Sequence, residues 1–124
     1  MEMERCHLWL ARFADRTEVD DYFEEIVPYP DDRPISLFAA DQGKRFYDHD
    51  WVFAEFHAGG NLGAILDAIR APAGTRDAVL AAAAGADFEC NAVVVADEGE
   101  FPEPVSVVGP PRLEYIGCHP LWGK

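Results

Sequence analysis

Hydrophobic and polar residues alternate with the two-residue period of β-strands in several segments of this chain. Residues 6–13 place Cys6, Leu8, Leu10 and Arg12 on one face and His7, Trp9, Ala11 and Phe13 on the other. Because both faces are mostly apolar, the pattern predicts an interior strand covered on both sides. Further strands are predicted at 51–57, 90–96 and 112–118, the last one ended by Pro120. Residues 97–111 are rich in proline and predict a loop that can hold one short strand at 105–108.

Four segments show the spacing of amphipathic helices. In residues 17–26 the apolar stripe is Val19, Tyr22, Phe23 and Ile26, with Thr17 as the expected N-cap and Asp20 three residues on. Residues 34–42 predict a short helix with Pro34 in its first turn and Gly43 closing it in a left-handed conformation. Two more helices are predicted at 62–70 and 75–85, capped by Asn61 and Thr75. The order of elements predicts an α+β fold: a mixed β-sheet covered by about four helices, in a single-domain sandwich over residues 1–124.

Length and composition agree with one folded domain. The chain has 124 residues, of which 49% are hydrophobic, so it can bury a core without staples. No apolar run approaches the roughly 20 residues of a membrane span, and the polar start of the chain does not resemble a signal peptide. A cytoplasmic protein is expected. Its three cysteines, Cys6, Cys90 and Cys118, are then expected to be reduced and unpaired.

Charge is the first property that narrows the function. The formal net charge is −13, from 23 acidic and 10 basic residues. This balance argues against binding to nucleic acid or to an anionic membrane surface, both of which need a basic surface. It is compatible with a basic protein partner, with a metal ion, or simply with solubility.

Acidic residues concentrate between Asp15 and Asp32, where eight acids accompany a single base, Arg16. A solvated helix face is the ordinary explanation. Mixed charges at i, i+4 would stabilise such a helix better, so repeated like charge indicates a possible binding surface. The candidate partner-binding residues of this region are Asp20, Asp21, Glu24, Glu25, Asp31 and Asp32.

One cluster has the residue types of a metal site. Asp48, His49 and Asp50 precede a predicted strand on which Glu55 and His57 share a face, and these five residues could serve a metal-dependent hydrolase. The spacing matches no known metal motif, and aspartates that cap a turn would explain it equally well. Cys6–His7 and Cys118–His119 are adjacent on strands and so point to opposite faces, which prevents nucleophile–base contact within each pair. No catalytic residue, metal ligand or cofactor is therefore assigned.

Three stretches together resemble the immunity protein 22 family. They are His7 to Phe13, Thr17 to Phe23, and Pro34 to Gly43 running into Phe46–Asp50. Members of this family, formerly a domain of unknown function, are predicted immunity proteins of bacterial polymorphic toxin systems. The resemblance covers residues 7–57 and implies a non-enzymatic inhibitor that binds a cognate toxin. An acidic inhibitor suits a basic toxin such as a nuclease domain. The alternatives are the metal-dependent hydrolase and a housekeeping interaction domain.

The segment 41–50 carries the most specific part of the resemblance, and it combines charges of both signs with two aromatic residues. Such a mixture is typical of interface hot spots. We expect Asp41, Tyr47, Asp48 and Asp50 to face the partner, while Gly43 and Phe46 support the fold. The alternative is structural: Gly43 closes the helix, Phe46 or Tyr47 fills the core, and the aspartates cap turns.

Overall fold

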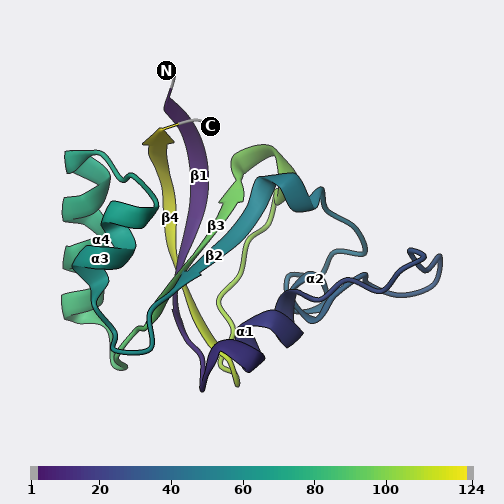
Figure 1. Cartoon of the computed structure of the whole chain (residues 1–124). Coiled ribbons are helices and arrows are strands. Elements are labelled where there is room, and N and C mark those ends of the chain that lie inside the picture. The colour runs from purple at the N-terminus through teal and green to yellow at the C-terminus, as the bar shows by residue number, and fades with distance from the viewer. Residues whose placement is uncertain (1–2, 123–124) are drawn as a thin grey trace.

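A four-stranded sheet lies between two layers of helices in the computed structural model, which describes residues 3–122 (Figure 1). The strands are β1 (Met3–Arg12), β2 (Val52–Phe56), β3 (Ala92–Asp97) and β4 (Arg112–Trp122). Helices α1 (Arg16–Phe23) and α2 (Leu37–Asp41) cover one face, and α3 (Leu62–Ala68) and α4 (Ala73–Gly85) cover the other. Two short 3-10 helices, η1 (His49–Trp51) and η2 (Glu98–Glu100), flank β2 and β3. The predicted α+β class with about four helices is confirmed.

The sheet is antiparallel throughout, with spatial order β2-β3-β1-β4, whereas the sequence analysis expected a mixed sheet. The connection through α1 and α2 does return β2 in the same direction as β1. However, β3 lies between these two strands and runs against both of them. Parallel strands therefore never become neighbours. Strand order is a non-local property that hydrophobic periodicity does not report.

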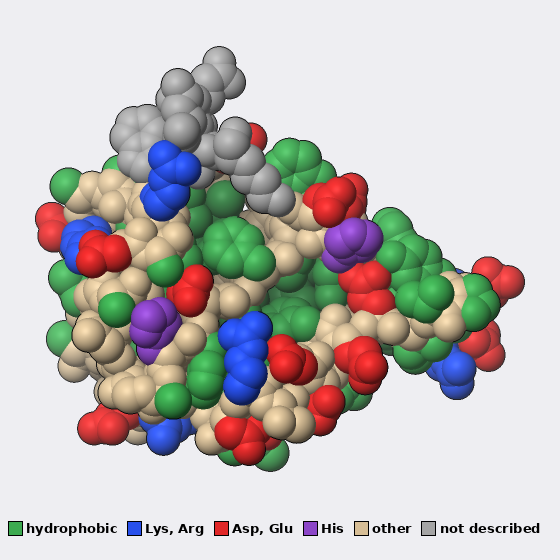
Figure 2. Space-filling view, viewed as in Figure 1, with side chains coloured by type: hydrophobic (Ala, Val, Ile, Leu, Met, Phe, Trp, Pro, Cys, Tyr) green, Lys and Arg blue, Asp and Glu red, His purple; other side chains and the backbone are tan. Residues whose placement is uncertain are grey.

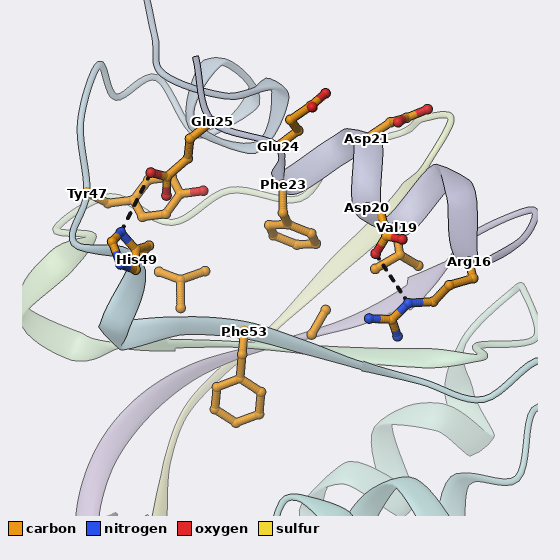
Figure 3. A pocket seen from close by; sticks show the side chains of 12 residues that line it. Arg16, Val19, Asp20, Asp21, Phe23, Glu24, Glu25, Tyr47, His49 and Phe53 are labelled. Atoms are coloured by element: carbon orange, nitrogen blue, oxygen red, sulfur yellow. Dashed lines mark ion pairs between the residues drawn. The ribbon is translucent and has the colours of Figure 1, made fainter. Parts of the chain in front are cut away.

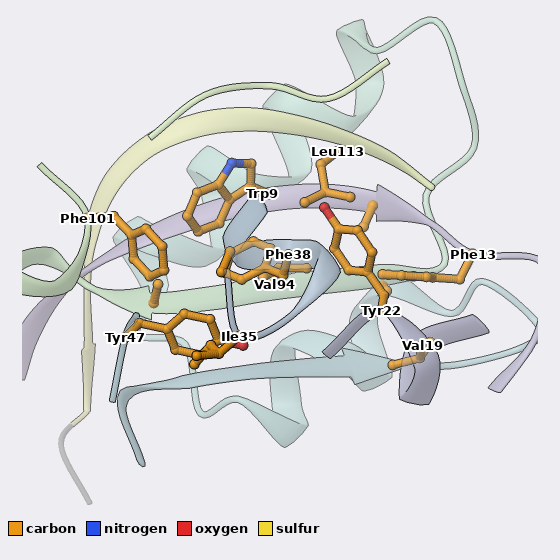
Figure 4. Close-up of a cluster of buried hydrophobic side chains, with 14 residues drawn as sticks. Trp9, Phe13, Val19, Tyr22, Ile35, Phe38, Tyr47, Val94, Phe101 and Leu113 are labelled. Carbon is orange, nitrogen blue, oxygen red and sulfur yellow. The ribbon is translucent and has the colours of Figure 1, made fainter. Parts of the chain in front are cut away.

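Strand β1 is covered on both faces, as its two apolar faces predicted. Trp9, Ala11 and Phe13 belong to a core cluster shared with α1 and α2, while Leu8 and Leu10 belong to a second cluster shared with α3 and α4. Figure 4 shows the first cluster, in which the rings of Trp9 and Phe38 meet edge to face with centroids 5.6 Å apart. His7 is also buried: one ring nitrogen lies 2.8 Å from the hydroxyl of Tyr115 and the other 2.7 Å from the carbonyl oxygen of Phe101.

Helix α1 begins and ends earlier than predicted. Its N-cap is Asp15 rather than Thr17: the Asp15 carboxylate accepts a hydrogen bond from the backbone N–H of Glu18 at 2.9 Å. The Glu18 carboxylate in turn accepts from the N–H of Ala14 at 2.8 Å, which satisfies a second free donor. The helix ends at Phe23: Glu24 already has an extended backbone (ψ 127°), so the last turn predicted up to Ile26 does not form.

Two other helix starts differ from the prediction. Helix α2 is capped by Ser36, whose hydroxyl accepts from the N–H of Ala39, so Pro34 lies outside it. Thr75 lies inside α4, which begins after Pro72, and its buried hydroxyl donates to the carbonyl of Pro120. The predicted cap Asn61 and the left-handed Gly43 (φ +72°) are confirmed.

Strand β4 continues through Pro120 to Trp122, although the proline was expected to end it. The reason is its position: β4 is the edge strand beside β1, and an edge strand can hold a proline whose nitrogen lacks a hydrogen. A β-bulge opposite Leu8 accompanies it, with Gly117 at φ +99°.

The two possible caps of α1 provide a stability test. Replacement of Asp15 by alanine leaves the N–H of Glu18 without its acceptor and is expected to lower the free energy of unfolding by about 1 kcal/mol. The matched variant Thr17→Ala, in the same exposed turn, is expected to change it by less than about 0.5 kcal/mol. Urea unfolding followed by circular dichroism measures both values. A larger loss for Thr17→Ala than for Asp15→Ala would contradict the observed cap.

Candidate functional site

An open groove of about 510 Å³ separates helix α1 from the edge strand β2 (Figure 3). Apolar side chains from both elements form its floor. They are Val19 and Phe23 from α1 and Val52 and Ala54 from β2. Four carboxylates line it, Asp20, Asp21, Glu24 and Glu25, and we call this feature the acidic groove.

The exposed position of these carboxylates follows from the way α1 packs against the core. Val19 and Tyr22 are buried, so the helical period turns Asp20 and Asp21 toward solvent. Asp20 lies 3.2 Å from the guanidinium of Arg16, but these side chains are 64% and 63% exposed, so the ion pair contributes little stability. In Figure 3 Asp21 and Glu24 point away from the sheet at the outer lip of the groove, and neither has an ion pair with another described residue.

Glu25 closes one end of the acidic groove and is less exposed than the other three. Its side chain is 15% exposed and lies 3.7 Å from Nδ1 of His49. It also accepts a hydrogen bond from the hydroxyl of Tyr29 at 2.7 Å, which is the largest cause of a raised pKa for that tyrosine. Besides His49, a single basic side chain, Arg16, lines the groove. Figure 2 shows the carboxylates gathered along α1 around a hollow with apolar walls.

The segment 41–50 is only partly as expected. Tyr47, predicted to face a partner, is 2% exposed, and its hydroxyl lies 3.1 Å from that of Ser36 in the core. Phe46, predicted to support the fold, is 52% exposed. The prediction for these two aromatic residues is therefore wrong. A loop has no periodicity from which the inward side chain could be read.

The three aspartates of this segment occupy different surroundings. Asp41 accepts a hydrogen bond from the hydroxyl of buried Tyr22 at 2.8 Å. Burial first, and then this bond, raise the pKa of Tyr22. Asp48 caps η1 by accepting from the N–H of Asp50 at 3.0 Å, which is the turn-capping role. Asp50 is exposed and lies 3.4 Å from Nε2 of His49.

Asp31 and Asp32 lie away from the acidic groove, in an arm formed by residues 26–35 that projects from the body in Figure 1. Backbone hydrogen bonds from Ile26 to Ile35 and from Ile35 to Arg45 hold its base. Its exposed apolar side chains were not predicted from the sequence. They include Val27, 78% exposed, and Tyr29, whose ring meets that of Phe46 at 5.3 Å. The signal available in the sequence was that Val27 and Tyr29 flank Pro28 and lie outside any helical stripe.

The five residues of the candidate metal site separate into two groups. Asp48, His49 and Asp50 lie around η1, before β2 begins. Glu55 and His57 lie at the other end of that strand, where their side chains are 3.4 Å apart. At a rise of about 3.3 Å per residue, β2 keeps the groups on the order of 10–15 Å apart. Within residues 3–122 no three histidine, cysteine or acidic side chains converge as ligands for a metal ion.

None of the three cysteines has the environment of an activated nucleophile. Burial, and then the Asp97 carboxylate, raise the pKa of the Cys6 thiol to about 12. Burial also raises the pKa of Cys90 and of Cys118, and the Cys118 thiol donates to the Glu98 carboxylate at 3.1 Å, which raises its pKa further. All three thiols are unpaired in the structure. A raised thiol pKa reduces the thiolate fraction, which is the nucleophilic form.

The helices within residues 3–122 are all too short or too polar to cross a lipid bilayer. No family model, curated protein or solved structure matches the chain. The resemblance to the immunity protein 22 family remains a hypothesis that rests on the residues named above.

Thiol chemistry tests this description of the cysteines. At pH 8 each native thiol is expected to react with iodoacetamide more slowly than glutathione does, and Cys6 slowest, because its pKa is raised to about 12. Replacement of Glu98 by glutamine removes the negative charge that raises the Cys118 pKa and leaves a weaker, neutral acceptor, so Cys118 should react roughly threefold faster. Mass spectrometry of the alkylated protein gives each rate. A thiol faster than glutathione would identify an activated nucleophile.

Proposed function

We propose that this chain is an immunity-type protein that binds a basic bacterial protein toxin in the cytoplasm and neutralises it without catalysis of its own. The observation that carries the proposal is the acidic groove, which combines four carboxylates at its margin with an apolar floor. An apolar centre surrounded by polar groups is the usual composition of a protein interface.

The two parts of the groove would do different work. The carboxylates, together with a net charge of −13, would speed encounter with a basic partner, an effect that reaches about 10- to 1,000-fold at low salt. The floor, with Val19, Phe23 and Val52, would supply apolar area that becomes buried in the complex. A toxin that acts on nucleic acid has a basic site for phosphates, and an acidic protein bound there would block it.

The two other functions have less support. The residues assigned to a metal-dependent hydrolase lie in two separate groups, and no observation favours that activity. A housekeeping interaction domain could use the same groove with another basic partner. The neighbouring gene discriminates: an immunity protein is encoded beside a large secreted protein with a variable C-terminal toxin domain.

Co-expression tests the function directly. The C-terminal domain of the neighbouring secreted protein should arrest growth when expressed alone in a bacterial cytoplasm. Growth should be restored by this chain and not by an unrelated acidic protein of similar size. If the neighbour lacks such a domain, or if the chain gives no protection, the immunity function is wrong.

The charges at the lip of the groove give a second test. Asp21 and Glu24 are exposed, so their double replacement by lysine should leave the fold nearly intact. At about 50 mM salt it should lower the association rate with the toxin domain by roughly tenfold, and it should flatten the salt dependence. Stopped-flow fluorescence measures the rates.

The matched control reverses Asp77 and Glu89, which are also exposed but do not line the groove, and changes the net charge equally. Its rate should remain within about threefold of the original, since only the overall field changes. An equal decrease in association rate for the two double variants would show that the groove carboxylates act only as ordinary surface charge.

A further inference from the structure

The two edges of the sheet are protected unequally. At the β4 edge, Pro120 removes a donor, the bulge at Gly117 interrupts the ladder, and Val107 exchanges backbone hydrogen bonds with Leu113. Prolines, bulges and covering loops are devices that prevent an edge from pairing with another strand. Strand β2 forms the opposite edge, and its residues, Val52 to Phe56, include no proline, glycine or bulge.

The alternation of hydrogen-bonded pairs along β2 shows which of its backbone groups face outward. The N–H of His57 donates to the carbonyl of Asn91 at 2.9 Å, next to the registered pair Phe56–Ala92. Hydrogen-bonded pairs alternate along an antiparallel ladder, so Phe53 and Glu55 bond to β3. Val52, Ala54 and Phe56 then direct their N–H and C=O groups away from the sheet. No helix or loop among the described residues pairs with that edge.

The same alternation along β2 places its free backbone edge beside the acidic groove. The side chains of Val52 and Ala54 lie on the face toward α1, where they form part of the groove floor. Phe53 projects from the other face, as Figure 3 shows, and is 42% exposed. In antiparallel pairing, residues directly opposite each other place their side chains on the same face. A strand added here would therefore point alternate side chains toward the groove carboxylates and toward Phe53.

We propose that the outer edge of β2 captures an extended segment of the partner as a fifth, antiparallel strand. The segment would alternate lysine or arginine, on the groove side where Asp20 points toward the sheet, with apolar residues on the side of Phe53. Charge complementarity selects the basic positions, and the unpaired backbone groups of Val52, Ala54 and Phe56 supply the pairing. The inference rests on the proposed function for the identity of the partner, but its geometry can be tested without the toxin.

The test uses a blocked heptapeptide that alternates lysine and valine. Isothermal titration calorimetry should detect binding, and amide chemical shifts should change along β2. In the proposed pairing the lysines lie opposite Val52, Ala54 and Phe56, so the backbone N–H groups of these lysines donate to β2. N-methylation of the backbone nitrogens of the two central lysines should weaken binding at least tenfold. N-methylation of two valine nitrogens, which face solvent, should change it less than threefold. Equal effects of the two methylations, or absence of binding at millimolar peptide, would overturn strand addition.

A protein variant adds an independent arm. The N–H of Ala54 points away from β3, so Ala54→Pro removes an outward donor without breaking the ladder. It should weaken peptide binding at least tenfold, while Ala54→Val should not. If Ala54→Pro fails to fold, the methylated peptides still decide.

The outcome is separable from that of the proposed function. Loss of toxin protection in the Asp21 and Glu24 lysine variant, combined with no binding of the peptide, would leave the immunity function standing and remove the strand addition. Peptide binding at β2 by a chain that gives no toxin protection would support the strand addition and contradict the immunity function.

Discussion

Burial of both faces of β1 is the constraint on which the rest of the structure depends. Trp9 and Phe13 require cover on one side, and Leu8 and Leu10 require it on the other. The chain meets this requirement with α1 and α2 on the first face and α3 and α4 on the second. Strands β3 and β4 occupy the two sides of β1, and the short β2 lies at the edge beyond β3, on the same side of the molecule as α1. The groove between α1 and β2 is thus a consequence of how the central strand is buried.

The groove gains its chemistry from the exposed side of α1. Once Val19 and Tyr22 are committed to the core, the helical period leaves Asp20, Asp21 and Glu24 around its rim. Like charges on one helix face lower its stability by a few tenths of a kcal/mol per pair, and a capping interaction at Asp15 offsets a cost of that size. A surface that combines such charge with an unpaired sheet edge is suited to binding an extended basic segment.

Local patterns predicted the elements well and their assembly poorly. Alternation in 6–13 identified β1 and its two covered faces, and single residues such as Asn61 and Gly43 marked helix ends correctly. Where two residues could serve the same role, the local signal was insufficient: Asp15 rather than Thr17 caps α1, and Tyr47 rather than Phe46 enters the core. Strand order and the continuation of β4 through Pro120 depend on long-range pairing. The acids of α1 were found in advance, but the apolar floor and free edge beside them were not.

Hydrogen–deuterium exchange of the chain, alone and in complex with the toxin domain encoded beside it, tests the central claim most directly. Binding at the acidic groove predicts slower exchange in 20–25 and at the outward amides of Val52, Ala54 and Phe56, with α4 unchanged. Protection confined to α3 and α4, or to no part of the groove, would contradict the account.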